Sequence, residues 1–175
     1  NRRQLQMCIR DMFQSEALQL TKEKLGHDKS LIGFVGGPWT VLSFGMGTNK
    51  LGSNSISLTR EKNFMLEEFI IPFLQKNISM QIEAGAETVM IFDSSAHQLV
   101  DDDFSSYLEK VVENMIKPFE QKVGYYAKEE VDYNCIISHA NNNENSFAGI
   151  GIDSQTSLQE TLTKVDHGFV QGNFD

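Results

Sequence analysis

The amino-acid sequence predicts an α/β fold with a parallel sheet, and two observations support this. Short, almost continuously apolar runs alternate with segments of helical spacing, which is typical of strands buried on both faces of a parallel sheet. Each run also passes directly into glycine or polar residues, as strands do where they enter loops. The expected strands are residues 31–36, 88–92, 133–138, 149–153 and 168–171.

Helices are expected before and between these strands, because apolar residues there recur every three or four positions. Pro72 is placed to start or kink the second helix. Asp101, Asp102 and Asp103 suit the N-terminus of the third helix, where carboxylates are favoured. Three adjacent carboxylates can also suggest a metal site, but a solvated helix end is the better interpretation. The expected helices are residues 5–26, 71–82, 101–115 and 155–165.

Two connections are irregular. Residues 45–58 are rich in Gly, Ser and Asn, which predicts either a mobile lid above a site or a solvated surface loop. The link 140–147 is too short for a parallel crossover, which needs about a dozen residues or more. Either the flanking strands are not parallel neighbours, or residues are missing there.

Five strands do not complete a closed barrel. A (β/α)8 barrel needs eight strand–helix units and about 250 residues, whereas this chain has 175 residues. Five parallel strands alone would leave unpaired edges, which proteins avoid or cover. We therefore interpret residues 1–175 as one domain, an incomplete portion of a (β/α)8 TIM barrel without its N- and C-terminal parts.

Composition narrows the function classes. The chain has 15 basic and 24 acidic residues, a net charge of −9, and no basic stripe, so nucleic acid and acidic membrane surfaces are not expected partners. Its apolar runs are too short to span a bilayer, and no secretory leader opens the chain. Cys8 and Cys135 form no disulfide pattern, which favours the reducing cytoplasm.

The most informative segment joins the first strand to the loop after it. Gly36 and Gly37 allow a tight turn or a close approach of the backbone to a ligand, and Pro38 fixes φ. The string from Gly33 to Phe44 resembles the Gly-Phe-x-x-x-Pro-aromatic-Thr signature of the uroporphyrinogen decarboxylase family. Two more segments are similar to that family in the same order: Glu83–Ala96, and the pair Gly151–Asp153 and Gln171–Asp175. The resemblance covers residues 16–175.

This resemblance implies a barrel enzyme, commonly a homodimer, that needs no metal or organic cofactor. Its family removes carboxyl groups from the four acetate side chains of uroporphyrinogen III. The product is coproporphyrinogen III, a precursor in haem biosynthesis. Such an enzyme must hold a polyanion, stabilise a cationic pyrrole ring and deliver protons.

Two substrate contacts of the family match residues of this chain. Ser94 corresponds to the hydroxyl residue after Phe-Asp, and Phe44 stands where the family has Tyr. Phe44 keeps the ring but lacks the hydroxyl donor, for which Ser43 is a possible substitute. The alternatives are a turn cap for Ser94 and core packing for Phe44.

The family's catalytic groups are not found in this chain. Its arginine cluster, the Asp that binds the pyrrole N–H groups and a late His belong to regions outside residues 1–175. A fragment of charge −9 should also repel a polyanionic substrate unless cations from elsewhere oppose it. The chain is therefore not expected to catalyse by itself.

Two other functions stay open. Related methyltransferases bind zinc through His-x-Cys and a later Cys, but His139 is followed here by Ala140 and Asn141. Cys135, expected four residues earlier on the same strand, would point away. The second alternative is a catalytically silent barrel that binds tetrapyrrole, supported by Phe44. His97, three residues after Ser94, could face the site, but a surface position is the preferred expectation.

Overall fold

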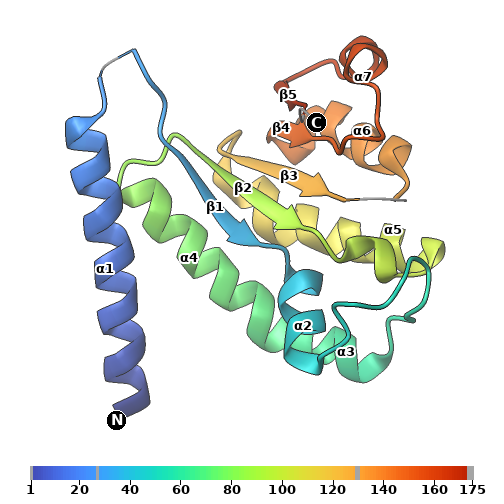
Figure 1. Cartoon of the computed structure of the whole chain (residues 1–175), viewed down its shortest axis with the longest axis horizontal. Coiled ribbons are helices and arrows are strands. Elements are labelled where there is room, and N and C mark those ends of the chain that lie inside the picture. Colours follow the sequence, from blue (N-terminus) through green and yellow to red (C-terminus); the bar gives the residue numbers. More distant parts are fainter. Residues whose placement is uncertain (1, 27, 129–130, 173–175) are drawn as a thin grey trace.

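The computed structural model describes residues 2–26, 28–128 and 131–172. Its five strands form one sheet in consecutive order, and every neighbouring pair is parallel (Figure 1). This order is the one that successive strand–helix units of a barrel produce. The sheet confirms the predicted parallel α/β fold, and closure into a barrel stays a prediction. The strands are β1 (Ile32–Gly36), β2 (Thr88–Asp93), β3 (Val123–Ala127), β4 (Phe147–Gly151) and β5 (Phe169–Gln171).

Helices connect each strand to the next. In Figure 1, α1 runs beside α4 at the β1 end of the sheet, and α6 and α7 lie at the β5 end. The α-helices are α1 (Arg2–Lys24), α2 (Pro38–Met46), α3 (Arg60–Met65), α4 (Ile71–Glu83), α5 (Asp101–Val111), α6 (Tyr133–Asn141) and α7 (Leu158–Lys164). Short segments add the π-helical turns η1 (Leu66–Ile70) and η3 (Val112–Ile116) and the 3-10 turns η2 (Ala96–Gln98), η4 (Lys117–Phe119) and η5 (Asn143–Asn145).

The predicted third strand, 133–138, is wrong. These residues form α6, and the third strand is β3, ten residues earlier. The side chain of Asp132 begins the helix by accepting hydrogen bonds from the backbone N–H groups of Asn134 and Cys135. The helix α6 is itself the crossover between the parallel neighbours β3 and β4. The shortness of the link 140–147 therefore requires neither missing residues nor strands that are not parallel neighbours.

The other predicted elements are present with shifted ends. The expected helix at 71–82 is α4, which Pro72 opens. The expected helix at 101–115 continues from α5 into η3, and α7 starts three residues later than expected. The helices α2 and α3 were not predicted.

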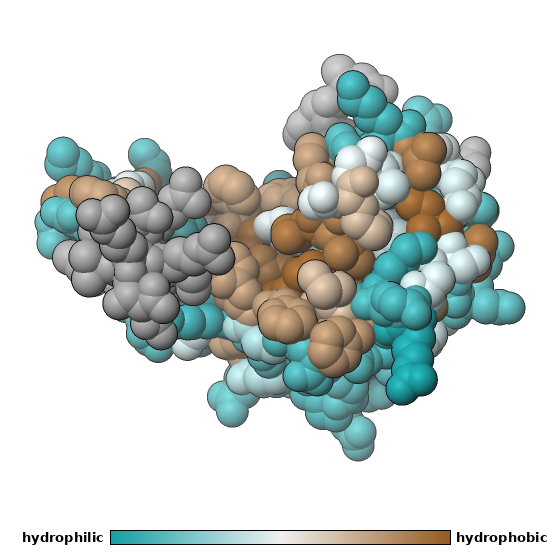
Figure 2. Space-filling model, turned by 90° about the horizontal axis from the view of Figure 1, so that it is seen from below, coloured by the Kyte–Doolittle hydropathy of each residue, from teal (hydrophilic) through white to brown (hydrophobic). Residues whose placement is uncertain are grey.

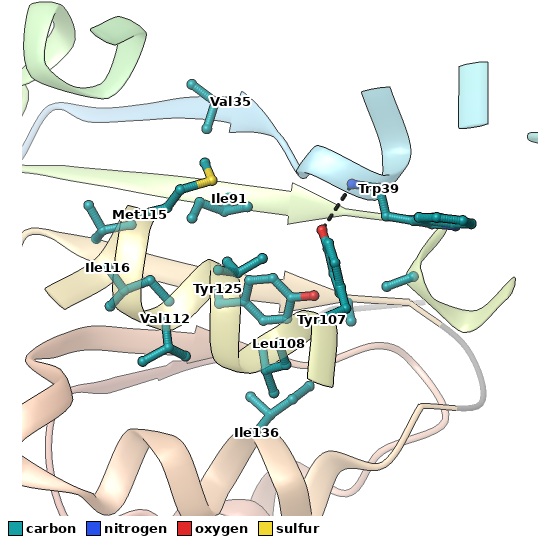
Figure 3. Close-up of a cluster of buried hydrophobic side chains, with 14 of the residues drawn as sticks. Val35, Trp39, Ile91, Tyr107, Leu108, Val112, Met115, Ile116, Tyr125 and Ile136 are labelled. Carbon is teal, nitrogen blue, oxygen red and sulfur yellow. Dashed lines mark hydrogen bonds between the residues drawn. The ribbon is translucent and has the colours of Figure 1, made fainter. Parts of the chain in front are cut away.

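The hydrophobic core lies on one face of the sheet, named here the covered face. Alternate strand residues enter it, as the period of two requires, except in β4, where a register shift against β3 leaves Phe147 and Ile150 three positions apart. Helix residues from α4, α5, η3 and α6 complete the cluster, part of which Figure 3 shows. The strand residues in it are Val35, Val89, Ile91, Val123, Tyr125, Ala127, Phe147 and Ile150, and the partly buried Val170 packs against the cluster.

The opposite face of the sheet, named here the bare face, carries the alternate residues and remains partly exposed. Ile32 is 53% exposed and Phe34 is 67% exposed. Met90 is buried but does not belong to the core cluster. Brown apolar side chains gather in the hollowed middle of the surface in Figure 2, bordered by teal polar groups. The bare face consists of Ile32, Phe34, Met90, Phe92, Tyr126 and Phe169.

The loop at 45–58 is fastened to the segment that follows β2. The backbone N–H groups of Ser55 and Ile56 donate to the Gln98 carbonyl at 2.9 and 2.8 Å. The Gln98 side chain donates to the carbonyls of Thr48 and Leu51 at 2.8 and 3.1 Å. These bonds favour a fixed surface loop over a mobile lid. None of the helices in the described part of the chain is long and apolar enough to cross a membrane.

Candidate active site at the carboxyl ends of β1 and β2

The first turn of α2 is capped from other parts of the chain. The N-cap residue is Gly37, which has no side chain for capping, and Pro38 has no N–H group. The backbone N–H of Trp39 donates to the hydroxyl of Tyr107 on α5 at 2.9 Å (Figure 3). That of Thr40 donates to the carboxylate of Asp93 at the end of β2, also at 2.9 Å. The free N–H groups of this helix start are therefore satisfied by β2 and α5.

The Asp93 carboxylate is the centre of this arrangement. One oxygen accepts from the Thr40 N–H and from the Thr40 hydroxyl at 2.8 Å. The other accepts from the Tyr107 hydroxyl and, at 3.2 Å, from the Tyr125 hydroxyl. A helix N-terminus also favours a negative charge. Four donors thus compensate a carboxylate that is completely buried.

Burial dominates the titration of this group. It raises the pKa of Asp93, and the hydrogen bonds from Tyr107, Thr40 and Tyr125 oppose the increase. The pKa of Tyr107 lies well above its usual range, first because the phenol is buried and second because the Asp93 charge is nearby. The pKa of Tyr125 is raised for the same two reasons. Both phenols therefore stay protonated and donate to the carboxylate.

Gly37 is required by this close packing. A Cβ atom at Gly37 would lie 2.1 Å from Cγ of Asp93. The backbone N–H of Gly37 also donates to the Phe92 carbonyl at 2.7 Å. Gly37 therefore makes a close approach to the Asp93 side chain of the same chain, and an approach to a ligand stays a prediction.

The two predicted substrate contacts lie at neighbouring strand ends. Phe44 is on α2, directly after β1, and its side chain is 62% exposed. Ser94 is half-buried in the turn after β2. The hydroxyl of Ser43, the suggested substitute donor, is buried and donates to the Thr40 carbonyl at 3.0 Å, so Ser43 does not take that role. Substrate contact by Phe44 and Ser94 stays a prediction.

An aromatic row crosses the bare face beside these strand ends. The rings of Phe34 and Phe92 meet edge to face with centroids 6.1 Å apart. The rings of Phe92 and Tyr126 do the same at 5.5 Å. Three adjacent strands therefore present one partly exposed aromatic surface, which suits the flat apolar body of a ligand.

The ends of β3 and β4 are joined by a tyrosine. Tyr133 donates its hydroxyl to the Ala127 carbonyl at 2.7 Å and accepts from the backbone N–H of Asp153 at 3.2 Å. The Asp153 carboxylate accepts from the hydroxyl of Thr156 at 2.8 Å and closes the turn after β4. At the end of β5, the last three residues of the motif Gln171–Asp175 lie outside the described residues.

The histidines do not occupy the positions expected from the sequence. His97 lies in η2 and is buried, which corrects the predicted surface position. His139 and Cys135 lie on α6 instead of on a strand, so the strand-end placement behind the zinc alternative is wrong. His27 lies outside the described residues. Within residues 2–26, 28–128 and 131–172, no group of three or more His, Cys, Asp or Glu side chains could hold a metal ion.

Sequence reasoning missed the residues that build this site. Thr40 and Asp93 were recognised only as members of the motif segments, and Tyr107 was not singled out within the expected helix 101–115. One signal was available, because a buried tyrosine hydroxyl needs a hydrogen-bond partner. Which partner it takes depends on contacts between residues far apart in the sequence.

Comparison with known proteins identifies the family. The family model described as uroporphyrinogen decarboxylase (URO-D) matches residues 9–175. The chain belongs to the uroporphyrinogen decarboxylase family. Proteins named uroporphyrinogen decarboxylase from Orientia tsutsugamushi (strain Ikeda) and Campylobacter lari are 32% and 30% identical to it. Each alignment covers 91% of this chain and 48% of the relative.

This member of the uroporphyrinogen decarboxylase family thus spans about half the length of the curated relatives it matches. A solved structure with a similar fold is a methyltransferase from Methanosarcina mazei, with a TM-score of 0.59 and 20% identity. That match covers 89% of this chain and 46% of the methyltransferase chain. At this identity the similarity shows the fold alone.

Proposed function

We propose that this chain is part of an enzyme that decarboxylates the acetate side chains of uroporphyrinogen III to give coproporphyrinogen III. Membership of the family and the relatives' shared name carry this proposal. Phe44 and Ser94 are the substrate-binding residues that this chain contributes. We further propose a cytoplasmic homodimer that uses no cofactor. Light scattering of the purified protein would test the dimer, and a monomer would contradict it.

The chemistry determines what the site must supply. Protonation of a pyrrole carbon makes the ring an electron sink, the bond to the carboxylate breaks, and carbon dioxide leaves. A second proton then converts the remaining carbon into a methyl group while the ring loses the first. Each step needs a proton donor and a place for the cationic ring.

The described residues fit the binding part of this task. The aromatic row of Phe34, Phe92 and Tyr126 offers ring faces that can contact the pyrroles and attract a cationic ring. Ser94 offers a hydroxyl beside it that can donate to a substrate carboxylate. The cations that would oppose the substrate's charges, and the catalytic groups, are assigned to the parts of the relatives that this chain does not span.

Phe44 differs from the Tyr that the family has at this position, and the proposal must account for this difference. An exposed ring without a hydroxyl can contact a pyrrole but cannot donate a hydrogen bond to a substrate carboxylate. We therefore expect Phe44→Tyr to strengthen binding of coproporphyrinogen III. One added hydrogen bond to a charged group corresponds to about tenfold or more.

The test uses the full-length protein and uroporphyrinogen III under anaerobic conditions. Stepwise loss of four carboxyl groups, followed by chromatography of the oxidised porphyrins, is the expected result. Phe44→Tyr should act at least as fast, and Ser94→Ala more slowly. Tight binding of coproporphyrinogen III together with no decarboxylation of uroporphyrinogen III would instead indicate a silent tetrapyrrole-binding protein and overturn the enzymatic proposal.

A further inference from the structure

Thr40 is bonded to the residues on both sides of Ser94. Its hydroxyl donates to the Asp93 carboxylate at 2.8 Å and accepts from the backbone N–H of Ser95 at 3.0 Å. Its own backbone N–H donates to the same Asp93 oxygen at 2.9 Å. Thr40 therefore holds the Asp93 carboxylate before Ser94 and the backbone N–H of Ser95 after it, from another strand–helix unit.

The same threonine is fixed relative to Phe44. Thr40 and Phe44 lie four residues apart on α2, so their side chains share one face of the helix. Asp93 and Tyr107 in turn hold the first turn of α2 against β2 and α5. Thr40 is thus bonded to both neighbours of Ser94 and lies one helical turn before Phe44, so it connects the two residues that we predict to contact substrate.

Only a hydroxyl can make this connection. The Thr40 oxygen acts as donor and acceptor at the same time, and the group is half-buried. Valine has nearly the same shape but provides neither function, whereas serine provides both. Loss of the hydroxyl would leave the Ser95 N–H without its acceptor and the Asp93 carboxylate with one donor fewer.

We propose that Thr40 is a positioning residue, which sets the place of the Ser94 hydroxyl relative to Phe44 at the substrate site. Thr40 does not touch the reacting atoms in this assignment. It acts through the Asp93–Ser94–Ser95 turn. The inference rests on the proposed function, because it assumes that Ser94 binds a porphyrinogen.

The first measurement needs no ligand. Amide hydrogen exchange at Ser95, followed by NMR in the full-length protein, should be about five- to tenfold faster in Thr40→Val, the effect of one lost hydrogen bond. Thr40→Ser should restore the slow rate. Thr48→Val is the matched control, because the Thr48 hydroxyl bonds only the Ser43 carbonyl in the described structure. An unchanged Ser95 rate in Thr40→Val would overturn the proposal.

The second measurement is a double-mutant cycle on coproporphyrinogen III binding. Thr40→Val should weaken binding about tenfold when Ser94 is present, and less than about twofold in a Ser94→Ala protein. Equal losses in both backgrounds would mean that Thr40 acts only on the general stability of the fold, and would overturn the proposal. If the unaltered protein does not bind coproporphyrinogen III, the proposed function fails, while hydrogen exchange still decides whether Thr40 fixes the turn.

Discussion

The covered and bare faces of the sheet are built from alternate residues of the same strands, yet the covered face is buried under helices and the bare face is partly exposed. On the covered face, Ile91 and Tyr125 are fully buried among helix residues. On the bare face, Ile32 and Phe34 keep more than half of their surface exposed. Both faces are apolar, so composition alone does not account for the difference.

This difference separates stability from binding. The covered face has helices packed on it, and it ends in the Asp93 carboxylate with its four donors. The bare face ends beside Ser94 and presents an aromatic row. Exposed apolar patches of this kind mark sites where other protein or a ligand binds. We therefore expect mutations on the covered face to unfold the protein and mutations on the bare face to alter recognition.

The largest expected effect compares one residue type on the two faces. Ile91→Ala should lower the free energy of unfolding by about 2–5 kcal/mol, because it leaves a cavity in a closed core. Ile32→Ala, on the neighbouring strand, should cost about 1 kcal/mol or less, because its side chain already contacts solvent. Urea denaturation measures both. Equal losses would mean that the bare face is covered in solution.

A smaller effect is expected where α2 meets the covered face. Gly37→Ala should destabilise the protein by about 1–3 kcal/mol, because the new methyl group would overlap the Asp93 side chain. Gly45→Ala on the same helix is the control. No atom lies within 4 Å of a Cβ there, and alanine should stabilise the helix by about 0.5–1 kcal/mol. A tolerated Gly37→Ala, measured by thermal unfolding, would contradict the close approach.

Removal of an aromatic ring from the bare face should change the stability of the fold only slightly, and it should reduce the exposed apolar surface. Phe34→Thr should lower the free energy of unfolding by about 0.5–1 kcal/mol, the contribution of its edge-to-face contact with Phe92. Binding of a hydrophobic dye should decrease at the same time. A loss as large as that expected for Ile91→Ala would show that Phe34 belongs to a closed core.

The smallest expected effect is a pH dependence on the covered face. Because burial raises the pKa of Asp93 in the folded protein, the folded state binds this proton more tightly than the unfolded state. The stabilisation is complete below the unfolded pKa of about 3.9 and is lost as the pH rises through the raised folded value. Asp93→Asn lacks this titration.

The free energy of unfolding of the unaltered protein should therefore fall relative to Asp93→Asn as the pH rises across that window. Urea titrations of both proteins at a series of pH values measure the difference. If the unaltered protein instead gains stability relative to the variant, the hydrogen bonds outweigh burial and the folded pKa of Asp93 is lowered.

Local sequence patterns predicted four of the five strands correctly and one strand incorrectly. Four apolar runs became β1, β2, β4 and β5, because they are short, continuous and bounded by turn residues. The run at 133–138 satisfies the same criterion but forms α6, with Asp132 as its N-cap. A short apolar run fits a buried strand and a helix equally well, and β3 contains Gly124 and two tyrosines that weakened its pattern.

The sequence by itself determined the parallel α/β class, the order of the units and the motif segments that carry the family resemblance, because these depend on residues close together in the chain. The tertiary structure alone decided that Thr40, Asp93 and Tyr107 meet at one point. They belong to three different elements, and a hydrogen bond across 53 or 68 positions leaves no periodic signal in the sequence. The separation of the two faces also came from tertiary structure, because in the described part of the chain the helices pack on the covered face, although both faces carry apolar side chains.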